Sequence, residues 1–200
     1  MKTLLRFVVL LTLVSLAVTC FAGKITIQSV TPSSTWYTYN VQNIINGAGL
    51  NQAGTLHDWN WQNMWVTNDT GTGWLKFDLG AVYSLDYSLV WNYNGVCCGL
   101  DRSVKNMDVL LSNDGVNFTY FNSFVLTEGT GNWIPADTLS LTGASARYIE
   151  FNLLSDYGDP DYIGLSEVQF YGPTGTPEPA TMLLLGSGVL AVARKLRNRA

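Results

Sequence analysis

The middle of this 200-residue chain consists of short runs rich in β-forming residues, several of which alternate apolar and polar side chains. Eight such runs can be recognised, at residues 24–30, 74–79, 85–93, 107–112, 118–126, 138–142, 147–153 and 163–171. Turn residues separate them, and Asn113-Asp114-Gly115 is a strong hairpin signal. Because half-buried strands alternate with a period of two, and no convincing helical period appears in this part, the pattern predicts six to eight strands packed as a sandwich.

The last two dozen residues have a different character. Pro177-Glu178-Pro179 is followed by an apolar run from Ala180 to Ala193 and by a basic tip at residues 194–199. As a helix this run would span roughly 21 Å, short of the ~30 Å hydrocarbon core, but it can lodge there if the basic tip snorkels to the interface. A buried C-terminal helix is the alternative, although Gly186 and Gly188 would weaken it.

The order of short motif, apolar segment and basic tip resembles the PEP-CTERM sorting signal of Gram-negative bacteria. The resemblance implies a sorting motif at Pro177, Glu178 and Pro179, a short transmembrane helix within residues 177–200, and an exosortase-type processing enzyme as a partner. Residues 173–176 form the expected linker to this signal. The chain is then anchored transiently in the membrane by its C-terminus, before it reaches the cell surface or extracellular matrix.

The other end of the chain indicates export. Lys2 and Arg6 accompany an apolar segment from Phe7 to Val18, and Cys20-Phe21-Ala22 offers small residues at both positions of a cleavage site. This pattern predicts a signal peptide over residues 1–22 and one domain over residues 23–172. A permanent N-terminal anchor is the alternative, but the apolar segment is short for a membrane span.

The predicted domain is acidic and poor in cysteine. Between residues 24 and 172 there are five basic and 14 acidic residues, a net charge of −9, whereas the whole chain carries −4. An acidic surface without a basic stripe argues against nucleic acid as a partner and is compatible with calcium or with neutral sugars. Cys97 and Cys98 are adjacent, so they form a vicinal disulfide or a free pair in a loop, and a disulfide-stapled fold is excluded.

Five segments carry a second resemblance. They are Asn-Ile-Ile-Asn-Gly at 43–47, Trp-Leu-Lys-Phe-Asp-Leu-Gly at 74–80, Val-Leu-Leu-Ser-Asn-Asp-Gly at 109–115, Ala-Arg-Tyr-Ile-Glu-Phe at 146–151 and Ile-Gly-Leu-Ser-Glu-Val-Gln-Phe-Tyr-Gly at 163–172. In this order they resemble the discoidin domains, also called coagulation factor V/VIII C-type domains, which include the family 32 carbohydrate-binding modules. The resemblance implies an all-β, galactose-binding-like jelly-roll β-sandwich whose terminal strands pair and whose function lies in loops at one end.

The resemblance also implies a structural calcium ion between the early loop and the final strand. Glu167 matches the glutamate ligand, whereas Asn46 stands where an aspartate is usual, so the affinity should fall. Carbonyl groups of residues 46–49, with Asp58 or Asn63, would complete the six to eight oxygen ligands that calcium prefers. The alternative is that Glu167 holds the loop through hydrogen bonds without a metal.

The predicted loops contain residue types that stack on sugars or form hydrogen bonds with them. These are His57, Trp59, Trp61, Asn92, Tyr93 and Arg102. Trp59 and Trp61 lie in a polar segment without the apolar neighbours of a core strand, although alternation could bury both on one face. If exposed, they predict a surface for carbohydrate.

Two functions from different classes follow. The first is a carbohydrate-binding module for extracellular polysaccharide or another glycan, and the second is a structural protein of an exopolysaccharide matrix or cell surface without a small ligand. Catalysis has little support, because the chain has one histidine and no serine elbow motif. Asp156, Asp159 and Asp161 resemble a turn before the last strand more than a glycosidase pair. We therefore expect no enzymatic activity.

Overall fold

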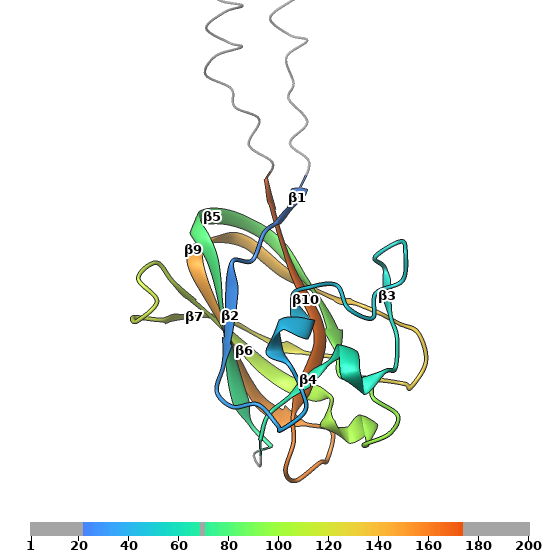
Figure 1. Cartoon of the computed structure of the whole chain (residues 1–200). Helices are drawn as coiled ribbons and strands as arrows, with labels where there is room; N and C mark the ends of the chain where they lie inside the picture. The colour runs from blue at the N-terminus through green and yellow to red at the C-terminus, as the bar shows by residue number, and fades with distance from the viewer. Residues whose placement is uncertain (1–21, 69–70, 174–200) are drawn as a thin grey trace, which may run out of the picture. The chain divides into compact units, whose positions relative to one another are not determined.

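A computed structural model describes residues 22–68 and 71–173 (Figure 1). Within these ranges the chain forms ten strands and three short 3-10 helices. Their bounds are β1 (Ala22–Ile25), β2 (Ser29–Pro32), η1 (Val41–Ile44), β3 (Leu56–His57), η2 (Trp61–Asn63), β4 (Trp65–Val66), β5 (Gly73–Asn92), η3 (Leu100–Arg102), β6 (Val104–Ser112), β7 (Thr119–Val125), β8 (Ile134–Pro135), β9 (Asp137–Asp156) and β10 (Gly164–Pro173).

The two predicted terminal signals lie almost entirely outside the described residues. Among the described residues, none forms a helix with the length and apolar character that a bilayer crossing requires. The short transmembrane helix expected within residues 177–200 falls in the part that the structure does not describe. It therefore stays a prediction.

Two strands of 20 residues each, β5 and β9, organise the fold. They pair antiparallel from Gly73↔Leu153 to Val90↔Asp137, and their register shifts between Asp78 and Tyr83. The first half of β5 pairs with β2 and the second half with β10, so one hydrogen-bonded sheet bends into two layers. Its strand order is β1-β10-β5-β9-β6-β7, with β2 beside β5 and β4 beside β10.

This continuity differs from the expectation of separate strands at residues 74–79 and 85–93. Gly80 does mark the break in the pattern, and its φ of 82° is a conformation that favours glycine. The chain bends there without leaving the sheet, because pairing with β9 resumes at Tyr83. A local turn signal and a bend within a long strand look alike in the sequence.

The core lies between the two layers and is centred on three phenylalanines. Phe77 of β5, Phe151 of β9 and Phe170 of β10 are fully buried. Their ring centroids are 5.1 to 5.8 Å apart in edge-to-face arrangements. Since these rings come from both layers, their contacts hold the layers together. The all-β jelly-roll architecture expected from the sequence is confirmed.

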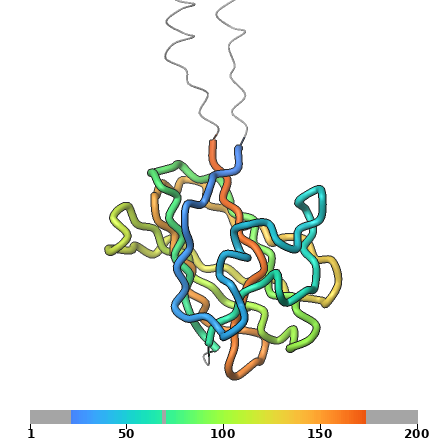
Figure 2. Tube along the Cα trace, in the orientation of Figure 1, coloured from blue at the N-terminus to red at the C-terminus, as the bar shows by residue number. Residues whose placement is uncertain are grey.

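The ends of the domain and its functional loops lie on opposite sides. β1 is next to β10 in the sheet, as the family resemblance implies. Figures 1 and 2 show the start of β1 and the end of β10 side by side at the top of the view. The loops at residues 93–103 and 157–163 lie at the bottom.

Candidate functional site

Three segments that are far apart in the sequence enclose a pocket of about 500 Å³ at this loop end. Its lining residues are Trp36, Thr38, Tyr39, Trp61, Cys97, Cys98 and Arg102. Trp61 is the first residue of η2, and the Asn60 side chain caps this turn by accepting a 3.2 Å hydrogen bond from the Gln62 N–H. Cys97 and Cys98 form a vicinal disulfide, which was one of the two states expected.

Aromatic rings and one guanidinium group give the pocket its chemistry. The Tyr39 and Trp61 ring centroids are 5.3 Å apart, and the Tyr39 hydroxyl lies 3.0 Å from the Tyr93 hydroxyl. Arg102 donates from Nε to Asp159 Oδ2 at 2.8 Å, and its guanidinium lies 4.4 Å from the ring centroid of Tyr162. The cation is thus fixed by an ion pair and by stacking.

The sequence-predicted ligand residues divide into two groups. Trp61 and Arg102 line the pocket. Trp59, two residues before Trp61, is 42 % exposed. His57, Asn92 and Tyr93 are buried, which corrects the expectation that their side chains belong to an exposed ligand face.

Each buried side chain has a structural reason. The Asn92 amide donates to the carbonyls of Val104 and Thr127 at 2.7 and 2.8 Å, which ties the end of β5 to the start of β6 and to the loop after β7. Tyr93 is buried behind the pocket, where its hydroxyl lies 3.0 Å from the hydroxyl of Tyr39. Burial lowers the pKa of His57, whose Nδ1 donates to the Asp58 carbonyl at 3.0 Å. Asn92 is thus buried because distant segments satisfy its hydrogen bonds.

Several pocket residues were missed by sequence reasoning. Trp36 and Tyr39 lie in the polar segment 33–40, which lacks the apolar alternation of a core strand just as residues 57–63 do. The same signal that singled out Trp59 and Trp61 would therefore have found them. Trp133, which is 46 % exposed, follows Asn132 in another polar loop.

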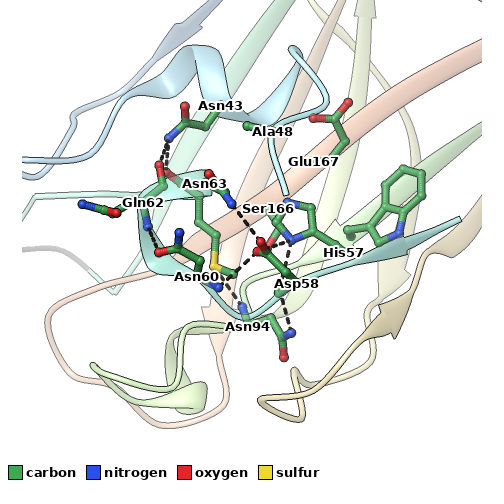
Figure 3. A network of polar contacts seen from close by, with 12 residues as sticks. Asn43, Ala48, His57, Asp58, Asn60, Gln62, Asn63, Asn94, Ser166 and Glu167 are labelled. Carbon is green, nitrogen blue, oxygen red and sulfur yellow. Dashed lines mark hydrogen bonds and ion pairs between the residues drawn. The ribbon is translucent and has the colours of Figure 1, made fainter. Parts of the chain in front are cut away.

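Asn94 is a further residue that the sequence did not reveal. It is fully buried, and its amide nitrogen donates to the carbonyl of Asp58 (Figure 3) and to that of Asn132. Its carbonyl accepts from the N–H groups of Thr130 and Gly131 at 2.9 and 2.7 Å. One side chain therefore fixes the two loops that carry Trp59 and Trp133.

Of the four residues proposed for calcium, Asp58 and Asn63 form one hydrogen-bonded pair, whereas Asn46 and Glu167 each bond to other residues. Asp58 Oδ2 accepts from the Asn63 amide at 2.9 Å, and Figure 3 shows this pair facing away from Glu167. Asn46 Oδ1 instead accepts from the Ala48 N–H at 2.7 Å. Among residues 22–68 and 71–173, no group of three or more His, Cys, Asp and Glu side chains is placed to hold a metal ion. This arrangement does not fit a calcium ligand set made of all four residues.

Glu167 holds the early loop through hydrogen bonds. Its Oε2 accepts from the Gly47 N–H at 3.0 Å, and its Oε1 accepts from the Gln169 amide at 3.2 Å. Burial raises the pKa of the Glu167 carboxyl to about 7, against the hydrogen bonds that favour its charge. The geometry supports the alternative role without a metal, and calcium binding stays a prediction.

Comparison with known proteins agrees with this fold. The model of the F5/8 type C domain matches residues 26–168, and the model of the PEP-CTERM protein-sorting motif matches residues 176–198. No curated protein matches the sequence.

Several solved structures have a similar fold. The family 32 carbohydrate-binding module (CBM) from C. perfringens NanJ in complex with galactose has a TM-score of 0.58 and 15 % identity, over 76 % of this chain and 99 % of that one. The lectin domain of Lectinolysin complexed with Lewis B antigen has a TM-score of 0.54 and 20 % identity, over 76 % and 98 %. Truncated AlyQ, with CBM32 and alginate lyase domains, has a TM-score of 0.54 and 20 % identity. The match to AlyQ covers 77 % of this chain but only 34 % of AlyQ.

Identities at this level show only that the fold is shared. The match of the family model shows that the chain belongs to the family. It spans most of the chain and all the strands that build the two layers except β1 and the end of β10. The sorting motif follows the domain directly. The chain therefore belongs to the F5/8 type C domain family and carries a PEP-CTERM protein-sorting motif behind its domain.

Proposed function

We propose that this chain is an exported, surface- or matrix-associated carbohydrate-binding module that binds extracellular polysaccharide in the pocket at its loop end, without catalysis. The observation that carries the proposal is the set of Trp36, Tyr39 and Trp61 around one pocket together with Arg102. Aromatic rings offer flat apolar surfaces to the C–H faces of a sugar, and a guanidinium donates to its hydroxyl groups.

The charge of the pocket favours a neutral or weakly charged glycan. Arg102 is compensated by Asp159, with which it forms a 2.8 Å ion pair. The domain around it has a net charge of −9, counted over residues 24–172. An anionic polymer would therefore be repelled by most of the surface, whereas neutral sugars need no opposite charge.

The comparisons support the same class of ligand and the same destination. NanJ and Lectinolysin, whose modules share this fold, were solved with galactose and with Lewis B antigen. The PEP-CTERM match supports export, with an exosortase-type enzyme as processing partner and a membrane contact through the C-terminal segment.

A glycan array tests the proposal. The full chain is applied in a detergent without sugar head groups, next to Trp61→Ala and to Tyr120→Ala, an exposed aromatic residue on β7 away from the pocket. We expect the wild type and Tyr120→Ala to bind the same glycans and Trp61→Ala to lose them while its thermal melt stays cooperative. Binding of no glycan by the wild type would favour the second function, a structural matrix or cell-surface protein without a small ligand.

A further inference from the structure

We propose that Trp59 and Trp133 form a second sugar-binding surface next to the pocket, so that the ligand is an oligosaccharide segment of a neutral polysaccharide rather than one terminal sugar. This inference rests on the proposed function and extends it to the length of the ligand. Four observations support it, on exposure, rigidity, continuity with the pocket and charge.

The two tryptophans are exposed as a pair. Trp59 is 42 % exposed and Trp133 is 46 % exposed, and their ring centroids are 5.9 Å apart with an interplanar angle of 80°. Leaving two indole rings in contact with water forgoes the free energy that their burial would provide. Exposed large aromatic side chains that lie together mark an interaction surface more often than scattered ones do.

The pair is held in place by a buried framework. The Asn94 amide donates to the carbonyls of Asp58 and Asn132, the residues immediately before the two tryptophans. β3 and β8, which pair through Leu56↔Pro135 and His57↔Ile134, fix the same two chain segments from below. A surface fixed in advance loses less conformational entropy when a ligand binds.

The chain segments that carry the two tryptophans adjoin segments that line the pocket. Trp59 is separated only by Asn60 from Trp61, which lines the pocket. The loop before Trp133 packs closely against Val96, the residue before Cys97 of the pocket. A Cβ added at Gly131 in this loop would lie only 2.6 Å from Val96 Cγ1. Short stretches of chain at residues 59–61 and 96–97 therefore connect the pair to the pocket lining.

Within the described part of the chain, no cation stacks on either ring of the pair. The cation–ring contacts within residues 22–68 and 71–173 involve neither Trp59 nor Trp133. Asp58, whose side chain is 23 % exposed, precedes Trp59 directly. A carboxylate here disfavours phosphate head groups and acidic polymers, which leaves a neutral sugar chain as the occupant.

Titration calorimetry on the full chain, in a detergent without sugar head groups, tests the proposal. The probes are four monosaccharides, glucose, galactose, mannose and N-acetylglucosamine, each paired with its β-1,4-linked tetrasaccharide. For at least one pair we expect the wild type to bind the tetrasaccharide about tenfold or more tightly than the monosaccharide, because each added stacking contact contributes on this scale.

Trp133→Ala should then lower the affinity for the tetrasaccharide about tenfold and change that for the monosaccharide less than twofold. Trp133→Phe should retain most of the affinity, and Tyr120→Ala should match the wild type. Trp61→Ala should lose both ligands. Thermal melts of all variants separate lost binding from lost folding.

The outcomes distinguish the two proposals. If the wild type binds neither member of any pair, both the proposed binding of these neutral sugars and the second surface are refuted. If the wild type binds monosaccharides but gains nothing with length, or if Trp133→Ala weakens both ligands equally or neither, only the second surface is refuted. A blue shift of tryptophan fluorescence in phosphatidylcholine vesicles that Trp133→Ala abolishes would assign the pair to lipid and also refute it.

Discussion

Replacing Glu167 by glutamine should make the domain more stable at alkaline pH and change its pH dependence. Glu167 is fully buried, and its pKa in the folded protein is raised from 4.5 to about 7. A carboxyl with a raised folded pKa stabilises the fold below its unfolded pKa, and this stabilisation is lost as the pH rises through the folded pKa. Between pH 5 and pH 8 the wild type should therefore lose about 2–3 kcal/mol of unfolding free energy from this group alone.

Glutamine has nearly the same shape and no charge, so it avoids this loss. Its carbonyl can accept from the Gly47 N–H, as Oε2 of Glu167 does. The amide nitrogen of the new glutamine then faces the amide nitrogen of Gln169, which donates to Glu167 in the wild type. The Gln169 amide group must therefore rotate by half a turn, after which it donates to the Tyr171 hydroxyl instead of accepting from it. This rearrangement sets a constant offset between the two proteins but does not depend on pH.

Urea unfolding in a chelator at pH 5, 6, 7 and 8 measures the effect. The quantity to follow is the difference in unfolding free energy between Glu167→Gln and the wild type. The lowered pKa of His57 acts in the opposite direction over this range, and it cancels in that difference. A difference that stays constant from pH 5 to pH 8 would refute the reasoning.

Calcium provides a second arm of the same experiment. If the ion binds Glu167, millimolar calcium should raise the melting temperature of the wild type and leave Glu167→Gln unmoved. The stabilisation reaches about 2.7 kcal/mol at a hundredfold excess over Kd. Equal melting temperatures with calcium and with chelator would end the calcium proposal without touching the pH argument.

Three further predictions concern the domain, its core and its early loop. The fragment 23–172 should be soluble and folded while the full chain partitions with membranes; pelleting of the fragment with membranes would show that the ends were misassigned. Phe77→Ala should lower the unfolding free energy by about 3–5 kcal/mol in urea, because the ring is fully buried against Phe151 and Phe170, and a loss below about 1 kcal/mol would place it outside the core. Asn46→Asp should tighten calcium binding in calorimetry by adding a charge; an unchanged Kd would exclude residue 46 as a ligand.

The features that the sequence predicted well are local ones. The hairpin at Asn113-Asp114-Gly115 forms between β6 and β7, where Asp114 accepts from the N–H groups of Val116 and Asn117 and Gly115 has a φ of 74°. Such contacts depend on neighbouring residues or on a recognisable motif.

The site depended on contacts between distant loops, which the sequence does not show. In the sequence Asn92 and Tyr93 end a strand and look like ligand-binding residues, but the carbonyls of Val104 and Thr127 accept hydrogen bonds from Asn92 inside the domain. Trp36 and Tyr39 reach the pocket from more than 50 residues before Cys97, through the closure of the whole sandwich. The residue types in the loops predicted the chemistry of the pocket. Which aromatic and basic residues line that pocket is determined by the fold.

The position of β10 has a mechanical consequence. β10 starts after the loop at 157–163 beside the pocket and ends at Pro173, from which the chain continues into the sorting motif. A pull between a glycan held in the pocket and a tether behind Pro173 would run along the length of this strand. The hydrogen bonds of β10 to β5, from Leu165↔Asn92 to Tyr171↔Tyr87, lie across that direction and would be loaded in shear together instead of opening one after another. If the proposed function holds, this architecture would resist a pull on the bound polymer.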